Sequence, residues 1–314
     1  MMSYYEPLVY MVPPEEEGFI LKTVLQKRLM VSRKLLSRIK LTEQGITVNG
    51  VRQYINIKVK AGDRVEIRME EEASEDILPQ DLPLHILHED EHLLILAKDA
   101  GIIVHPTHGH YVNTIANGVV YHWQQAGSTC RFRPVHRLDQ ETSGVLAIAK
   151  TPYVHQQISE QMIQHQVKKE YLAFVWGRFE ETKGTINEPI DRDPEQPHVR
   201  IVTPEGYSAV THYEVVEQYV QAALVRIWLE TGRTHQIRVH MRHLGHPLIG
   251  DKMYTLPEFE TSPAAEEAGK RLSRQALHAF RLGFVHPGTR EWAEFNAPLP
   301  ADLADLQAWL QKNN

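Results

Sequence analysis

Residues 135–150 read VHRLDQETSGVLAIAK, a polar loop that leads directly into an apolar run. The apolar run at 144–149 predicts a strand that follows this loop. Before it, the sequence Thr-Ser-Gly indicates a turn, and Asp139 follows Arg137 by two positions. From these residues alone, a salt-bridged turn is the simplest interpretation, because structural ion pairs imitate functional ones.

Further strands and helices surround this stretch. Three runs bounded by glycine are predicted strands: HLLILAKDAG (92–101), KKEYLAFVWG (168–177) and QAALVRIWLETG (221–232). One helix is expected to begin at Pro152, and another to span 233–245 with Ile237, Met241 and Leu244 facing inward. Strands are numerous and do not alternate regularly with helices. We therefore predict an α+β fold with a mixed, largely antiparallel sheet and flanking helices.

The N-terminal part of the chain has a different pattern. Residues 20–69 combine one or two short amphipathic helices, with Ser32 as a helix cap, and a β-ribbon around the turns NG and AGD. Residues 70–84 are acidic, contain proline and lack periodicity, so we expect a linker there. The predicted division is an extension over 1–19, a small α/β-ribbon domain over 20–69, the linker, and a large domain over 85–314.

Charge is distributed unevenly along the chain. The formal net charge of the 314 residues is −6, which by itself argues against nucleic-acid binding. Residues 20–69, however, contain twelve Lys or Arg against Glu43, Asp63 and Glu66, so this segment carries +9 and the remainder −15. Its basic residues include Arg33, Lys34, Arg38 and Lys40. Such asymmetry indicates a nucleic-acid contact surface in the small domain.

Composition excludes several protein classes. A single cysteine, Cys130, leaves no disulfide framework and no multi-cysteine zinc site. No apolar run of about 18 residues predicts a membrane span, and the N-terminus does not resemble a secretory signal. We therefore expect a cytoplasmic protein without a membrane partner. No oligomeric state is indicated.

Most searches for a chemical motif fail. The histidines at 235–246 do not follow the H-E-x-x-H spacing, so we expect no metal. G-x-S-x-G, a P-loop and G-x-G-x-x-G are all missing from the sequence, so neither a serine nucleophile nor a nucleotide cofactor is expected. What remains is a lone carboxylate, Asp139, among arginines. Such a group can act on a sugar carbon as nucleophile or as acid and base, although glycosidases usually need a second carboxylate and Glu141 is too close in sequence.

The motifs resemble a known family. HRLDQETSGVLAIAKT (136–151) resembles the signature of the RluA-type pseudouridine synthases, and KKEYLAFVWG and LETGRTHQIRVHMRHLGHPLIGD (229–251) resemble the second and third motifs of that family. Residues 20–69 are similar to the αL-type RNA-binding module that precedes many of these domains. One departure is Ala97-Lys98-Asp99-Ala100-Gly101, which lacks the usual proline of the opening motif.

The resemblance implies roles for individual residues. Asp139 corresponds to the catalytic aspartate, Arg137 to the arginine that takes the place of the extruded base, and Tyr171 to the tyrosine that stacks on the uracil. Arg233 corresponds to the basic residue that pairs with Asp139. His136 is expected to contact substrate, and the basic residues Arg33, Lys34, Arg38 and Lys40 to contact RNA.

The implied reaction is physically consistent with these residue types. Extruding a uridine from folded RNA costs a few kcal/mol, and base–aromatic stacking, worth roughly 1–3 kcal/mol, offsets much of that cost. Whether Asp139 attacks the anomeric carbon or removes a 2′ proton of the ribose stays open. Neither route needs a cofactor.

We therefore predict a cofactor-free isomerase that converts uridine to pseudouridine in structured RNA. Family resemblance favours large-subunit ribosomal RNA as the substrate, with transfer RNA as an alternative. Two other classes of function are a non-catalytic RNA-binding ribosome assembly factor and a carbohydrate-active hydrolase that uses Asp139.

Overall fold

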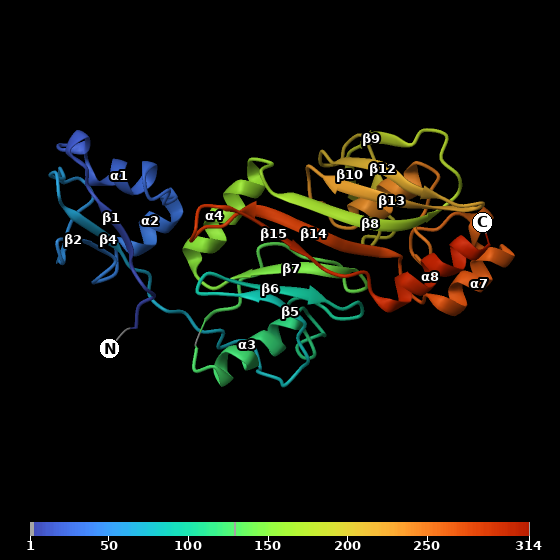
Figure 1. Ribbon diagram of the computed structural model, residues 1–314, viewed down its shortest axis with the longest axis horizontal. Helices are drawn as coiled ribbons and strands as arrows, with labels where there is room; N and C mark the ends of the chain where they lie inside the picture. The colour runs from blue at the N-terminus through green and yellow to red at the C-terminus, as the bar shows by residue number, and fades with distance from the viewer. Residues whose placement is uncertain (1–2, 129, 314) are drawn as a thin grey trace.

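The computed structural model describes residues 3–128 and 130–313. Figure 1 shows a small N-terminal unit at one end of an elongated molecule and a larger unit built around one broad sheet. This arrangement confirms the predicted α+β fold with a small domain before a mixed, largely antiparallel sheet. In the described part of the chain, no helix has both the length and the apolar character needed to cross a membrane.

The small unit is a four-stranded antiparallel sheet in the order β1-β4-β2-β3, packed against two helices. Its elements are β1 (Leu8–Met11), α1 (Leu21–Lys27), α2 (Arg33–Ile39), β2 (Ile46–Val48), β3 (Val51–Arg52) and β4 (Arg64–Ile67), with a 3-10 turn at Pro14–Glu16. The Ser32 hydroxyl accepts a hydrogen bond from the Leu35 amide, which confirms the predicted cap of α2. Asn49 and Gly50 both have positive φ, as a tight hairpin between β2 and β3 requires.

Part of the predicted N-terminal extension over 1–19 forms a strand of the small unit's sheet. β1 pairs antiparallel with β4 along its whole length, from Leu8 opposite Ile67 to Met11 opposite Arg64. The strand is short, and its residues alternate between partly buried and exposed, so its sequence gives only a weak signal. The domain boundaries at 69, 84 and 85 remain predictions.

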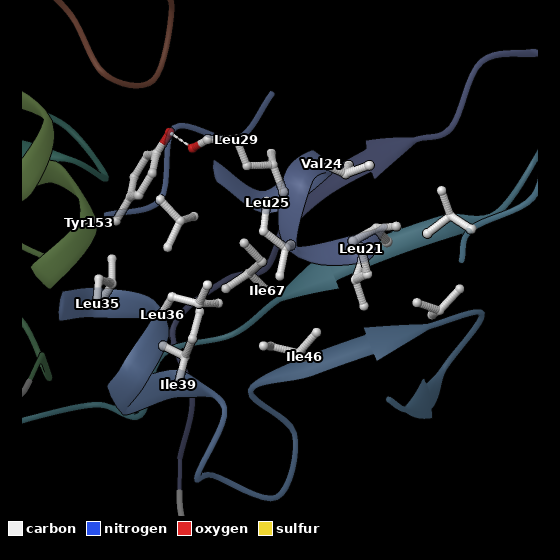
Figure 2. Packing of buried hydrophobic residues seen from close by; sticks show 14 of the residues in the cluster. Leu21, Val24, Leu25, Leu29, Leu35, Leu36, Ile39, Ile46, Ile67 and Tyr153 are labelled. Atoms are coloured by element: carbon white, nitrogen blue, oxygen red, sulfur yellow. Dashed lines mark hydrogen bonds between the residues drawn. The ribbon is translucent and has the colours of Figure 1, made fainter. Parts of the chain in front are cut away.

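The small unit docks on α4 (Pro152–Ile163) of the large unit. Figure 2 shows Tyr153 of α4 beside the small domain's apolar cluster, with its hydroxyl donating to the Leu29 carbonyl at 2.9 Å. Two further side chains of α4, Gln156 and Gln157, donate to the carbonyl of Met30 at 2.7 and 2.8 Å. These bonds hold the segment between α1 and α2 against the large unit.

Residues 70–84 form no helix or long strand, but they are packed rather than free. Ile77 is 4% exposed and belongs to the apolar cluster around α3 (Ile115–Gln125). Glu72 is paired with Arg38 of the small unit and, at 2.9 Å, with Arg133 of the large unit. This segment therefore connects the two units through ion pairs as well as through the backbone.

The large sheet has nine strands in the order β5-β6-β7-β14-β8-β13-β12-β9, with β15 paired to β14. The strands are β5 (Ile86–Glu89), β6 (Leu93–Lys98), β7 (Ser143–Ala149), β8 (Lys168–Trp176), β9 (Lys183–Asn187), β12 (Val210–Gln218), β13 (Ala222–Leu229), β14 (Leu277–Val285) and β15 (Trp292–Asn296). A separate two-stranded sheet pairs β10 (Ile190–Arg192) with β11 (Arg200–Val202). The β7–β14 pair is parallel, and the other pairs of the large sheet are antiparallel.

Helices cover parts of both faces of this sheet. α3 packs on one face through Leu94 and Leu96 of β6, and α4 on the other through Leu93 and Ile95 of the same strand. The remaining helices are α5 (Gln236–His243), α6 (Pro257–Glu260), α7 (Pro263–Arg271) and α8 (Ala301–Lys312). β6 and β7 are buried on both faces, which explains their continuously apolar sequences, and β7 confirms the strand predicted from the apolar run at 144–149.

One detail of α5 differs from the prediction. The helix begins at Gln236 rather than at residue 233, and Ile237 and Met241 face the core as expected. Leu244 is 37% exposed, because it follows the last helical residue and the chain turns at Gly245, whose φ is 88°.

Gly144 generates the first testable prediction. Its φ is 125°, and a Cβ at this position would lie 2.1 Å from the Ala279 carbonyl oxygen of β14. We expect Gly144→Ala to destabilise the fold by about 3 kcal/mol or more, because backbone strain and a clash with neighbouring backbone act together. Urea denaturation measures this change.

The matched control is Gly269→Ala in α7, where nothing lies within 4 Å of the added methyl. A helical Gly→Ala change should stabilise by about 0.5–1 kcal/mol. Equal free energies of unfolding for the two variants would contradict the close approach of β7 and β14.

Candidate active site

A cleft of about 670 Å³ opens on the sheet face that carries α4 and α5. Its walls are the loop before β7, the C-terminal end of α4, the first half of β8 and the segment from Leu229 to Arg238. The structure brings together here five side chains singled out from the sequence: His136, Arg137, Asp139, Tyr171 and Arg233. They come from three separate segments of the chain.

The loop that carries Asp139 is held in place by a buried lysine. Lys98, at the end of β6, is 2% exposed, and its ammonium donates to the carbonyls of Asp99, Ile102 and Gln140 at 2.7–2.9 Å. Burial lowers the pKa of Lys98 to about 8. The three carbonyls come from two loops, so Lys98 fastens the turn after β6 to the residue that follows Asp139.

A second buried cation fixes the other end of this loop. Arg274 donates to the Glu141 carbonyl at 3.1 Å and to the Ser143 hydroxyl at 3.4 Å, and its guanidinium is paired with Asp302 of α8. The Ser143 hydroxyl also lies 2.9 Å from Nδ1 of His278. The Thr-Ser-Gly turn is therefore part of a hydrogen-bonded junction between β7 and β14.

Asp139 pairs with Arg238. Nη1 of Arg238 lies 3.7 Å from Oδ2 of Asp139, while Nε and Nη2 bind both carboxylate oxygens of Asp251 at 2.6 and 2.8 Å. Asp251 has a fully buried side chain, and Asp139 is 31% exposed. Burial lowers the pKa of the Arg238 guanidinium, but the bonds to Asp251 outweigh this effect and the pKa is raised. A permanent positive charge thus faces Asp139 from inside the protein.

The expected pairing of Asp139 with Arg233 is therefore wrong in this structure. Nε of Arg233 donates instead to the Ser208 carbonyl at 3.0 Å, and its guanidinium lies over the ring of Tyr207. Arg233 precedes α5, whereas Arg238 lies one turn inside the helix and faces the buried side. The two arginines share one motif, and only the helix start decides which one points inward.

His235 provides a second contact to Asp139. Its Nε2 lies 3.9 Å from Oδ2 of Asp139, and its Nδ1 lies 2.8 Å from the Tyr254 hydroxyl. That hydroxyl also accepts a hydrogen bond from the Arg200 amide at 2.8 Å. Burial lowers the pKa of His235, although Asp139 acts in the opposite direction. The residue is left-handed, with φ 57°.

Tyr171 forms the floor of the cleft. The residue is 8% exposed, and it lies on β8 opposite Ile227 of β13. Burial, with a smaller contribution from Asp139, raises the pKa of its phenol, so the ring stays neutral. An uncharged aromatic ring beside the carboxylate can pack against a base without competing for a proton.

His136 and Arg137 differ although they are adjacent. Nε2 of His136 accepts from the Ala147 amide at 3.3 Å, and burial lowers the pKa of this imidazole to about 4, so it is neutral at pH 7. Its Nδ1 has no partner among the described residues. Arg137 is exposed on the cleft wall, and within the described chain its guanidinium forms neither a hydrogen bond nor an ion pair. It is free to bind a ligand.

The predicted RNA-contacting residues of the small domain lie outside this cleft. They are exposed on α2 and just after it: Arg33, Lys34, Arg38 and Lys40. The sequence argument did not identify the buried groups that orient the site, namely Lys98, Arg238, Asp251 and Arg274. Lys98, Arg238 and Asp251 lie within the quoted motifs, whereas Arg274 lies outside them.

Comparison with known proteins agrees with this geometry. Residues 92–243 match the family described as RNA pseudouridylate synthase. The chain is 40% identical to the uncharacterised RNA pseudouridine synthase YhcT of Bacillus subtilis, over 95% of this chain and 96% of the relative. It is 36% identical to the ribosomal large subunit pseudouridine synthase D of Blochmanniella floridana, over 99% of this chain and the full length of the relative.

One solved structure has a similar fold. Human RNA pseudouridylate synthase domain containing 1 is similar with a TM-score of 0.56 and 25% identity, over 74% of this chain and 96% of that chain. Fold and cleft together define an RNA-modifying isomerase. The chain belongs to the RNA pseudouridine synthase family, whose members isomerise uridine to pseudouridine in RNA.

The two arginines generate a direct prediction. We expect Arg238→Lys to lower the rate of pseudouridine formation in bound RNA by about 100-fold, because the planar fork to Asp251 is lost and the charge facing Asp139 moves. We expect Arg233→Lys to change that rate by less than about fivefold, since an exposed pair contributes 0–1 kcal/mol. Single-turnover assays measure both rates, with circular dichroism to check folding. The reverse order of effects would restore the pairing of Asp139 with Arg233.

Proposed function

We propose that this protein converts uridine to pseudouridine in large-subunit ribosomal RNA, with Asp139 acting on the ribose of a nucleotide extruded from its helix. The observation that carries this proposal is the position of Asp139, partly exposed in the cleft, 3.7 Å from the buried Arg238 and beside Tyr171. A carboxylate paired with a buried arginine next to an aromatic floor is suited to a reaction at a sugar carbon that bears a flat base.

In this proposal, the neighbouring side chains bind the nucleotide and orient the carboxylate. Arg137 is unpaired at the cleft wall, so its planar guanidinium can enter the space that the extruded base leaves. Tyr171 receives the uracil against its ring. Arg238 and His235 orient the carboxylate through their contacts with it. His136 lines the cleft next to Arg137, which supports its contact with substrate.

The reaction is an isomerisation and is balanced without a co-reactant. The bond from C1′ of the ribose to N1 of uracil breaks, the base rotates, and C1′ bonds to C5. N1 gains a proton and C5 loses one, so no electrons are exchanged with another molecule. Both routes considered for Asp139 place its carboxylate next to the ribose, which the cleft allows.

The choice of RNA rests on the relatives. Proteins named ribosomal large subunit pseudouridine synthase D match most of this chain, in Blochmanniella floridana at 36% identity and in Nitrosomonas europaea at 42% over 72% of the chain. Ribosomal RNA of the large subunit is therefore the substrate we propose, and a cytoplasmic setting fits it.

The small domain supplies a second RNA contact in this proposal. Its exposed basic residues Arg33 and Lys34 begin α2, which lies next to α4, and the far end of α4 lines the cleft through Met162 and Ile163. One RNA molecule can therefore contact α2 while its target nucleotide lies in the cleft.

The central prediction concerns Asp139. Asp139→Asn should fold and bind RNA, but pseudouridine formation should fall by about 100- to 10,000-fold, the usual contribution of a positioned acid or base. Chemical labelling of pseudouridine in large-subunit ribosomal RNA measures this, in cells that lack the protein and express either form.

Glu141→Gln is the matched control, because it removes the next carboxylate along the chain, and it should restore labelling. Labelling at the wild-type level in Asp139→Asn cells would overturn the assignment of Asp139. A site that appears only in transfer RNA would correct the proposed substrate.

The small domain generates a prediction about salt. We expect the triple change of Arg33, Lys34 and Lys40 to Gln to weaken RNA binding and to reduce the slope of log affinity against log salt by about 2–3, because each phosphate contact releases counterions. The control changes Arg178, Lys183 and Lys312, which are exposed on the large unit, to Gln. Equal slopes in both triple variants would show that α2 does not contact phosphate.

A further inference from the structure

Among the residues that the structure describes, no helix covers one half of the sheet face opposite Tyr171. Toward the C-terminal end of β8, this face is covered by α7 and α8, which pack on Phe174 and Trp176. At the other end of the same strand, the side chains of Lys168 and Glu170 lie at the surface with no helix over them. The large sheet therefore has uncovered strands close to the active-site cleft. These strands are uncovered on the face opposite to the cleft.

A row of side chains crosses these bare strands. Register places His212 of β12 opposite Trp228 of β13, Trp228 opposite Glu170 of β8, and Glu170 opposite Arg281 of β14. Trp228 is 37% exposed, although a tryptophan ring is the largest apolar side chain. On the next strand, Trp292 is 46% exposed. The ammonium of Lys168 lies over the Trp292 ring, 5.4 Å from its centroid, whereas Trp228 lines a cavity and can stack on a ligand.

The Trp228 ring is held by its neighbours. His212 stacks on it with ring centroids 5.6 Å apart and an angle of 23° between the planes. The imidazole is fixed in turn by Thr185 at 2.8 Å and by Glu230 at 2.7 Å. A ring held in this way loses little conformational freedom when a second flat group packs on it.

A second cavity of about 670 Å³ lies over this row. It shares four lining residues with the active-site cleft: His165, Lys169, Leu229 and Glu230. The two cavities therefore meet at the ends of β8 and β13, and a chain that leaves one can enter the other. No such continuity is needed for a free small molecule, but it is expected for successive nucleotides of one strand.

Charge indicates which part of a nucleotide is bound. The cavity contains Lys168, Lys169 and Arg226, but also Glu170, Glu214 and Glu230. A surface with as many carboxylates as basic groups does not favour a bare phosphate. It suits a base, whose ring and exocyclic N–H groups can donate to carboxylates while its face stacks on the indole.

We propose that this cavity, which we call the Trp228 site, binds a base of the substrate RNA next to the target uridine. The inference rests on the proposed function for the identity of the RNA, but it assigns a different surface. As the strand passes over the junction of the two cavities, the target base enters the cleft and a flanking base stacks on Trp228. The extruded segment is then held on both faces of one sheet.

The test uses an in vitro transcript of large-subunit ribosomal RNA and the full chain. Trp228→Ala should weaken binding by about 5- to 100-fold, the loss of one base–aromatic stack. Trp228→Phe, which keeps a ring, should recover most of the affinity. Val220→Ala is the matched control, because Val220 is 55% exposed in the turn between β12 and β13 and lines neither cavity. Unfolding temperatures check that the variants fold.

Two further measurements separate stacking from other roles. The loss in Trp228→Ala should be the same at every salt concentration, because stacking releases no phosphate counterions. Ultraviolet cross-linking should join the peptide containing Trp228 to a nucleotide. Unchanged affinity in Trp228→Ala together with no cross-link would overturn the Trp228 site. Pseudouridine formation that is lost in Asp139→Asn would still stand in that case, so the two proposals can fail separately.

Discussion

The guanidinium of Arg238 is the charge on which the cleft depends. It is almost completely buried, and a buried cation is stable only when its hydrogen bonds are satisfied. Asp251 takes two of its N–H groups and leaves the third nitrogen facing Asp139. Removing Asp251 would leave an uncompensated charge in the protein. The requirement that Arg238 be paired therefore orients α5, the segment that carries Asp251 and the loop of Asp139 relative to one another.

The sheet explains why such a charge can be held firmly. β6 and β7 are buried on both faces. The loop that carries Asp139 is bound by Lys98 at one end and by Arg274 at the other. All three cations donate to groups that belong to different segments. The catalytic carboxylate we propose thus lies on a loop whose backbone carbonyls are bound by buried cations. The position of the carboxylate is therefore fixed although its side chain is partly exposed.

Much of the fold was predictable, because it depends on local chemistry. The continuous apolar runs of β6 and β7, the start of α4 at Pro152 and the cap at Ser32 are properties of short stretches. β1 was missed because an edge strand of four residues gains its stability from β4, more than fifty positions away. Leu244 was misplaced because the end of α5 depends on where the chain turns at Gly245.

The sequence by itself determined the family motifs, the aspartate among arginines, the basic character of the small domain and the order of strands and helices. Only the tertiary structure decided which arginine faces Asp139, because Arg233 and Arg238 differ in direction, not in chemistry. It also decided that Trp228 and Tyr171 lie on opposite faces, since strand pairing and helix packing determine which side stays bare. Both outcomes depend on contacts between segments far apart in sequence, and such contacts leave no local pattern.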